Sequence, residues 1–181
     1  MMKQKVDLWE YAGQICSAMK KGILLTTRAN GKVNTMTIGW GFLGIEWGKP
    51  IFIALVRESR HTRKMLDESG EFTVNIPCGE VDPKILGFCG RNSGANVDKI
   101  ETLCLTLEEP NVISTPGICQ LPLTLECKVL YRQPQDLTLI PKDLLDTYYP
   151  QDVDGSEPGK NRDYHIAYYA EIVDSYLITK K

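Results

Sequence analysis

The stretch Gly39–Gly44 reads G-W-G-F-L-G and decides between two fold classes. Its spacing matches the G-x-G-x-x-G pattern of dinucleotide-binding α/β proteins, in which a helix begins directly after the glycines. Here residues 45–50 read I-E-W-G-K-P, which indicates a turn followed by a strand. Because no helix follows the glycines, the pattern argues against a Rossmann fold and favours a strand that contains glycines.

Strand patterns surround this stretch on both sides, and Asn30-Gly31 is a strong hairpin signal. We expect strands at 23–27, 33–45, 51–57, 71–76, 103–107, 123–131 and 165–177. Helices are expected at 9–19 with Gly22 as its stop, at 62–69 with Gly70 as its stop, from Asp82-Pro83 onward, and at 141–149. Polar loops are expected at 91–98 and 151–162. Many strands with short helices and no βαβ alternation predict a mainly β fold, a closed or nearly closed β-barrel, in a single domain over residues 1–181.

The composition limits the class of protein. With 181 residues, 43% hydrophobic and 24% charged, the chain is expected to form one globular domain. A net charge of −2 without a basic stripe argues against a nucleic-acid partner. No apolar run approaches the roughly 20 residues of a membrane helix, and the first ten residues do not resemble a signal peptide. We therefore expect a cytoplasmic protein that does not contact a membrane.

The six cysteines form no C-x-x-C pair, so neither a zinc knuckle nor a disulfide framework is expected. We predict that they are buried, reduced thiols. With only His61 and His165, a histidine-rich metal site is excluded. There is also no G-x-S-x-G or H-E-x-x-H motif, so no catalytic nucleophile or metal ligand is assigned.

Residues 56–62, V-R-E-S-R-H-T, lie where a strand is expected to end and a helix to begin. Free N–H groups at a helix start attract anions, and Arg57 and Arg60 can bind phosphate oxygens. Ser59 and Thr62 add hydroxyl donors. The alternative is an ordinary helix start with solvated arginines.

Two further segments are polar where a ligand would need donors. One expected strand carries Asn34, Thr35, Met36 and Thr37, followed by Trp40. Its accessible edge suits the polar pyrimidine half of an isoalloxazine ring, and Trp40 would pack against that ring. The alternative is an edge strand with a core tryptophan. The loop around Ser93 leads to Lys99, which would add a positive charge near a phosphate. The alternative is a solvated loop lysine.

Together these segments resemble a known family. N-x-M-T-x-x-W at 34–40, S-R-x-T at 59–62, G-E-F-T-V-N at 70–75 and S-G-x-x-x-D-K at 93–99 are similar to the flavin reductase-like, flavoredoxin-type FMN-binding proteins. The resemblance runs from about Gly22 to Lys99 and continues more weakly over 165–177.

The resemblance implies an FMN-binding split β-barrel and a homodimer with FMN near the subunit interface. It implies that residues 34–37 face the flavin and its ribityl chain, and that Ser59, Arg60 and Thr62 hold the phosphate, assisted by Arg57 and Lys99. His61 stands at a position that is often aromatic in the family, where it packs near the cofactor or points to solvent. Trp40 and Ser93 complete the expected cofactor-binding residues.

An FMN protein of this kind would carry out hydride transfer from NAD(P)H to flavin and on to an acceptor, without a catalytic residue of its own. The first alternative is an FMN electron carrier reduced by a partner protein. The second is a split barrel that binds another ligand such as haem, which the two arginines and two hydroxyls disfavour. We favour the interpretation that His165 lies on a strand with surface aromatics, and the alternative is a position beside the flavin.

Overall fold

A computed structural model describes residues 1–154 and 161–179. Most of its strands form one sheet with the order β3-β2-β6-β9-β10-β5-β4, in which every neighbouring pair is antiparallel, and β1 pairs with β10 beside that path. The strands are β1 (Met2–Lys5), β2 (Ile23–Ala29), β3 (Lys32–Ile38), β4 (Gly41–Glu46), β5 (Lys49–Arg57), β6 (Glu71–Ile76), β9 (Leu123–Pro134) and β10 (His165–Thr179), while β7 (Leu107–Glu108) and β8 (Gly117–Ile118) pair separately. The expected mainly β fold with short helices is confirmed, but β3 and β4 do not pair, so the rolled sheet is not closed.

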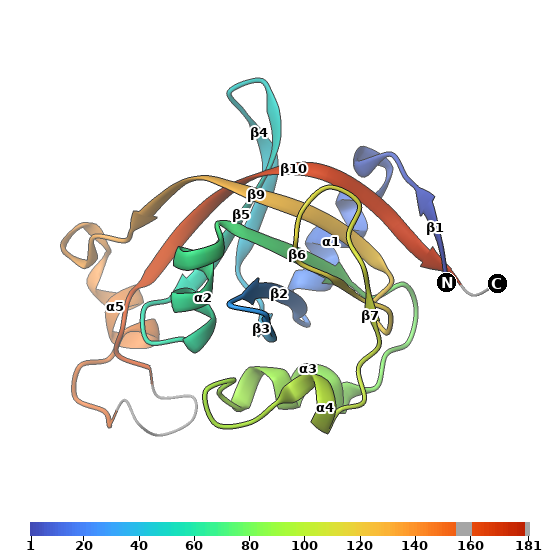
Figure 1. Cartoon of the computed structure of the whole chain (residues 1–181). Helices are drawn as coiled ribbons and strands as arrows, with labels where there is room; N and C mark the ends of the chain where they lie inside the picture. The colour runs from blue at the N-terminus through green and yellow to red at the C-terminus, as the bar shows by residue number, and fades with distance from the viewer. Residues whose placement is uncertain (155–160, 180–181) are drawn as a thin grey trace.

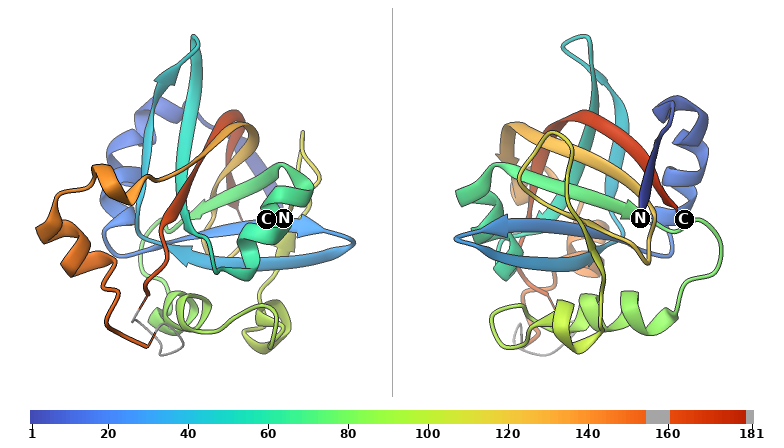
Figure 2. Two further views of the ribbon diagram at one scale, coloured as in Figure 1. Left: turned by 90° about the vertical axis from the view of Figure 1, so that its left-hand side faces the viewer. Right: turned by 45° about the vertical axis from the view of Figure 1, so that its right-hand side comes forward.

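Short helices lie around the sheet (Figures 1 and 2). They are η1 (Leu8–Tyr11), α1 (Ala12–Met19), α2 (His61–Ser69), α3 (Pro83–Arg91), α4 (Lys99–Thr102), η2 (Leu137–Leu139) and α5 (Lys142–Tyr148). The predicted stop at Gly70 is confirmed, because this residue caps α2 with a φ of 63°. The predicted start of α3 is confirmed too, since Asp82 accepts a hydrogen bond from Lys84 N–H and Pro83 occupies the first turn.

The single strand expected over 33–45 is wrong. β3 ends at Ile38 and β4 begins at Gly41, and the two strands lie at opposite ends of the sheet order. The chain must therefore bend at Gly39–Trp40 to pass from one end of the sheet to the other. Gly41 allows the backbone of β5 to approach β4 closely, because a Cβ at this position would lie 2.7 Å from the backbone oxygen of Ile53.

The strand expected over 103–107 is also largely wrong. The backbone N–H groups of Leu103 and Leu105 donate to the backbone oxygens of Lys99 and Ile100 in α4, and Cys104 has a φ of 48°. Only Leu107 belongs to a strand. The remaining predicted elements agree with the structure within a few residues, except that part of the loop expected over 151–162 lies outside the described residues.

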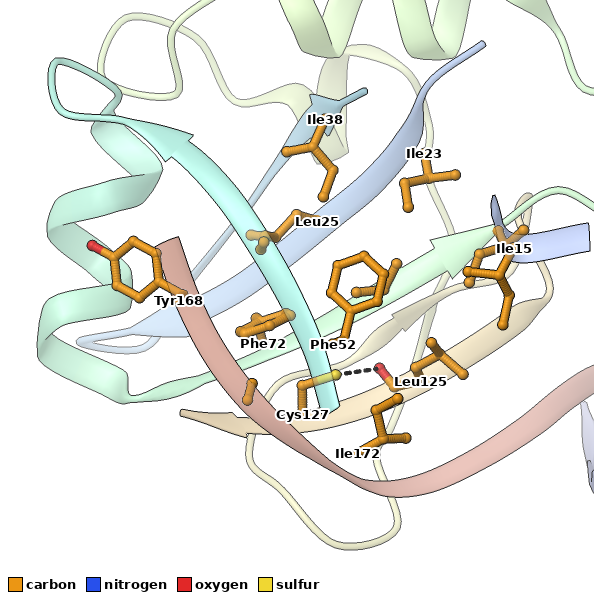
Figure 3. Packing of buried hydrophobic residues seen from close by; sticks show 14 of the residues in the cluster. Ile15, Ile23, Leu25, Ile38, Phe52, Phe72, Leu125, Cys127, Tyr168 and Ile172 are labelled. Carbon is orange, nitrogen blue, oxygen red and sulfur yellow. Dashed lines mark hydrogen bonds between the residues drawn. The ribbon is translucent and has the colours of Figure 1, made fainter. Parts of the chain in front are cut away.

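The main core fills the inside of the rolled sheet. Figure 3 shows Phe52, Phe72 and Ile172 pointing toward one another from β5, β6 and β10, with Ile15 of α1 beside them. A second cluster, which includes Leu24, Ile85, Cys89, Leu105, Ile118 and Leu121, lies between the outer face of the sheet and the helices α3 and α4. Two layers of packing thus hold β3 between the barrel interior and α3.

The cysteines divide between these layers and the surface. Cys89 and Cys127 are buried as predicted, whereas Cys16, Cys78 and Cys104 are exposed and contradict the prediction. Burial raises the pKa of the Cys89 thiol to about 11, so this thiol is protonated at neutral pH. Cys127 Sγ lies 3.9 Å from the backbone oxygen of Leu125 within the core (Figure 3).

Candidate functional site

A small cavity of about 120 Å³ lies between the start of α2, the strand β3 and the loop after α3. It brings together seven of the residues expected at the cofactor. They are Met36, Ser59, Arg60, His61, Thr62, Ser93 and Lys99, and the cavity is completed by Cys89, Gly90, Asn92 and Gly94. Two segments separated by about thirty residues, the S-R-x-T turn and the S-G loop, therefore meet at one point, as the sequence motifs led us to expect.

The turn between β5 and α2 provides the donors of this cavity. β5 ends at Arg57, Arg60 is extended with φ −68° and ψ 134°, and α2 begins at His61. The first N–H groups of a helix have no partner within it and can bind an anion, and the Arg60 guanidinium lies beside them, where its Nη2 donates to Asn161 Oδ1 over 3.0 Å. The local sequence thus places the N-terminus of a nine-residue helix at this cavity.

A buried hydrogen bond fixes the position of Thr62. Asn34 on β3 donates from Nδ2 to Thr62 Oγ1 over 2.8 Å, and both side chains are buried. Gly94 lies directly against this pair, because a Cβ there would come within 2.1 Å of Asn34 Oδ1. Asn34 therefore orients a residue of the cavity.

Lys99 is buried at the back of the cavity, with 3% of its surface exposed. Its Nζ donates to the backbone oxygens of Thr35 on β3 and Cys89 on α3, each over 2.9 Å. Burial, with a smaller lowering effect from the positive charge of Arg60, brings the pKa of Lys99 down to about 8. Lys99 is therefore not a solvated loop lysine, and its ammonium ties α3 to β3.

Thr35 and Thr37 are not part of the small cavity. Their side chains point to the other face of β3, where Thr35 Oγ1 lies 3.0 Å from Thr26 Oγ1 and Thr37 Oγ1 donates to the backbone oxygen of Leu86 over 2.7 Å. Only their backbone groups face the free edge of β3, as the bond from Lys99 to the Thr35 oxygen indicates.

Arg57 points away from the cavity. Its guanidinium donates to the backbone oxygens of Asp163 over 2.6 Å and Tyr148 over 2.9 Å, and it lies 5.2 Å from the ring centre of Tyr149. Burial lowers its pKa, against the opposing effect of Asp163. Arg57 therefore anchors the segments before β10 and after α5.

Trp40 joins an aromatic cluster beside this anchor. Its ring lies 4.7 Å from that of His165 and 5.2 Å from that of Tyr148, and Tyr149 Oη lies 2.9 Å from His165 Nδ1. His165 is buried with 6% exposure, so the favoured interpretation of a surface position is wrong for this residue. Burial, with Arg57 next, lowers the pKa of His165 to about 4, and the ring is neutral at physiological pH.

Sequence reasoning missed Tyr148, Tyr149, Asn161 and Asp163, which contact the expected site residues. No local pattern could have found them, since their partners lie about 90 to 106 positions away. A larger hollow of about 1,160 Å³ lies elsewhere, between α1, the segment 77–83 and α3, and Thr37 alone among the predicted site residues lines it. The larger hollow is therefore not the one that gathers the predicted site residues.

Comparison with known proteins gives the family. Residues 17–175 match the family model described as "Flavin reductase like domain". The chain belongs to the flavin reductase-like family. An uncharacterized protein of Archaeoglobus fulgidus is 33% identical over 99 residues, a match that spans 55% of each chain, so only about half of that relative is covered.

Solved structures share the fold of this flavin reductase-like protein. An FMN-binding domain of a flavin reductases-like enzyme from Shewanella baltica has a TM-score of 0.65 at 16% identity, covering 97% of this chain and 77% of that one. Flavoredoxin of Methanosarcina acetivorans has a TM-score of 0.61 at 23% identity, covering 87% and 68%. An NADH:FAD oxidoreductase of Streptomyces globisporus has a TM-score of 0.59 at 14% identity, covering 87% and 75%. The fold is therefore the split barrel of the flavin reductase-like proteins, and flavin binding is the property of its family.

The residues present fit the phosphate end of a flavin nucleotide. Arg60, Lys99 and the N-terminus of α2 supply positive potential, and Ser59 and Thr62 supply hydroxyls. Ligand pockets usually measure roughly 300–1,000 Å³, so the small cavity is sized for a phosphate and its linker and not for a whole ring system. No helix within the described residues is long and apolar enough to cross a membrane.

Proposed function

We propose that this protein binds FMN and is an NAD(P)H:flavin oxidoreductase that passes electrons to an acceptor. The observation that carries the proposal is the convergence of Arg60, Thr62 and Lys99 on one cavity in a chain of the flavin reductase-like family. Bound FMN would supply the redox chemistry, by taking a hydride from a reduced nicotinamide.

The chain's own residues would bind and orient. Ser59, Arg60 and Thr62 would hold the phosphate, with Lys99 contributing its charge from behind. Asn34 keeps the Thr62 hydroxyl in place. Since the cavity admits only the phosphate end, the ring would lie outside it, along β3 from Met36 toward Trp40, where the edge of the strand offers backbone donors and acceptors.

The aromatic cluster would wall the ring at the Trp40 end. His165 is neutral there, because its pKa is lowered to about 4, so it would act through hydrogen bonds and packing and not through charge. No residue of the site is needed as a general acid or base. The proposal assigns the protein the tasks of fixing the cofactor and leaving one face open to the second substrate.

The partner we propose is a second copy of the chain. The β4–β5 hairpin projects from the body in Figure 1, and its apolar residues Phe42, Ile45 and Trp47 are 60%, 72% and 56% exposed. Three large, exposed apolar side chains on one projecting hairpin support an interface with a second copy. The homodimer is tested by light scattering: Ile45→Glu should yield a monomer, whereas a monomeric wild-type protein would contradict the dimer.

The function is tested by the visible spectrum of purified protein before and after anaerobic addition of NADH and of NADPH. A flavin spectrum that bleaches supports the oxidoreductase. A flavin spectrum that persists with both nucleotides supports the alternative, an FMN electron carrier reduced by a partner protein. Protein that is colourless and fails to bind added FMN would overturn both.

The phosphate site has its own test. Arg60→Gln should weaken FMN binding about 10- to 100-fold, because it removes a charge-assisted contact, and should leave riboflavin binding unchanged. Arg91→Gln, which removes an exposed arginine at the end of α3, is the matched control.

A further inference from the structure

The segment 161–163 lies against the turn that opens α2. Asp163 Oδ2 accepts a hydrogen bond from the backbone N–H of Ser59 over 2.8 Å. Asn161 Oδ1 accepts one from Arg60 Nη2 over 3.0 Å. The Arg60 guanidinium, which the proposed function assigns to the phosphate, and the backbone N–H of Ser59 beside it are thus already bonded to oxygens of the chain itself.

The Asp163 carboxylate is held in this position. Its backbone oxygen accepts from Arg57 Nη1 over 2.6 Å, and its Oδ1 lies 3.9 Å from the same nitrogen. The side chain is 18% exposed, and that of Arg57 is 13% exposed. Such a shielded pair keeps its place better than a pair of surface side chains would.

A carboxylate at this place opposes a phosphate in two ways. It competes for the Ser59 N–H, and it carries the same sign of charge as the phosphate dianion that would approach Arg60. The amide of Asn161 competes in the first way only, because it is neutral.

We propose that Asp163 is a specificity-determining residue that acts as an internal competitor of the FMN phosphate. This inference rests on the proposed function. The carboxylate weakens binding of the phosphorylated flavin without touching the ring, and Asn161 adds a smaller competition at Arg60. The consequence is a cofactor that exchanges with free FMN and is not retained as a permanent prosthetic group.

The test measures binding and release of two flavins that differ only in the phosphate. Affinity for FMN and for riboflavin is obtained from flavin fluorescence quenching, and release of FMN from the recovery of fluorescence on dilution. Asp163→Asn keeps the size of the side chain and an oxygen acceptor for the Ser59 N–H, so the fold should persist. We expect about tenfold tighter FMN binding, correspondingly slower release, and unchanged riboflavin binding.

A matched control and a second variant sharpen the result. Asp143→Asn removes the same charge from the exposed side of α5 and should change neither affinity. Asn161→Ala frees the Arg60 guanidinium and should tighten FMN binding by a few fold. Thermal unfolding of each variant checks that its fold is intact.

The outcomes separate the two proposals. FMN binding that is unchanged or weaker in Asp163→Asn, while the wild-type protein binds FMN, overturns the competitor role and leaves the proposed function standing. Equal tightening for riboflavin also overturns it, since the effect would not act through the phosphate. Failure of the wild-type protein and of every variant to bind FMN overturns both.

Discussion

Lys99 and Thr35 are joined by a hydrogen bond of 2.9 Å between a buried ammonium and a backbone carbonyl oxygen on β3. The same ammonium bonds to the carbonyl oxygen of Cys89, so its hydrogen-bond partners within residues 1–154 and 161–179 are uncharged. A positive charge without a carboxylate partner in a buried place is costly unless an anion approaches it. We therefore expect the charge of Lys99 to depend both on pH and on whether a phosphate is bound.

We predict that FMN affinity falls as the pH rises through about 8. The pKa of Lys99 is lowered to about 8, so the charge that attracts the phosphate is lost above this value, whereas Cys89 stays protonated with a pKa of about 11. Titration of FMN at pH 7, 8 and 9 measures the effect. Lys99→Met should bind more weakly at pH 7 and show no such fall, and Lys64→Met, on the exposed side of α2, should behave as wild type. A wild-type affinity that is constant to pH 9 contradicts the role of this charge.

Gly94→Ala should destabilise the protein by about 1–3 kcal/mol. The new methyl group would lie 2.1 Å from Asn34 Oδ1, and Asn34 cannot swing aside without breaking its buried bond to Thr62. Urea denaturation gives the stability, and the affinity for FMN should fall with it, because Thr62 loses its support.

The control for this substitution is another glycine. Gly13→Ala, in α1, meets no atom within 4 Å and should stabilise the protein by about 0.5–1 kcal/mol through helix propensity. If Gly94→Ala were as stable as wild type, the close packing of the S-G loop on Asn34 would be refuted.

Glu126→Gln should cost about 2–4 kcal/mol of stability without changing the FMN phosphate site. The fully buried Glu126 carboxylate accepts from the backbone N–H groups of Asn111, Val112 and Ile113, at 2.6 to 3.1 Å. An amide turns an NH₂ group toward these donors. Chemical denaturation measures the loss of stability, and Glu10→Gln on the exposed 3-10 helix is the control. A loss below about 0.5 kcal/mol would show that the segment 111–113 does not depend on this carboxylate.

His165 should make the protein sensitive to acid between pH 6.5 and about 4. Its pKa in the folded chain is lowered to about 4 from 6.5, so over this interval the unfolded chain binds more protons and the free energy of unfolding falls as the pH falls. His165→Gln should remove this part of the decrease, as measured by thermal unfolding at pH 7, 5.5 and 4.5. An unchanged pH dependence in the variant would mean that another group titrates.

The features that the sequence predicts well depend on neighbouring residues. The start of α2 within S-R-x-T, its stop at Gly70 and the cap at Asp82 follow from local conformational preferences, and the structure contains all three. The meeting of the S-R-x-T turn with the S-G loop followed from the family motifs and not from either segment alone.

The features that were missed depend on partners far along the chain. The break at Gly39–Trp40 exists because β3 pairs with β2 while β4 pairs with β5, and strand propensity does not encode which partner is taken. The direction of Arg57 is set by Asp163, more than one hundred residues later. Burial of His165 likewise requires Trp40 and Tyr149, which no window around it contains.

The place of β10 in the sheet has a consequence for synthesis of the chain. This strand lies between β9 and β5 and also pairs with β1, yet its residues emerge last from the ribosome among the described elements. Until then the edges of β5 and β9 have no partner, and unpaired edges invite association with other chains. The nascent protein therefore cannot complete this sheet until β10 has been synthesised, and a chaperone that shields strand edges would matter most before that point.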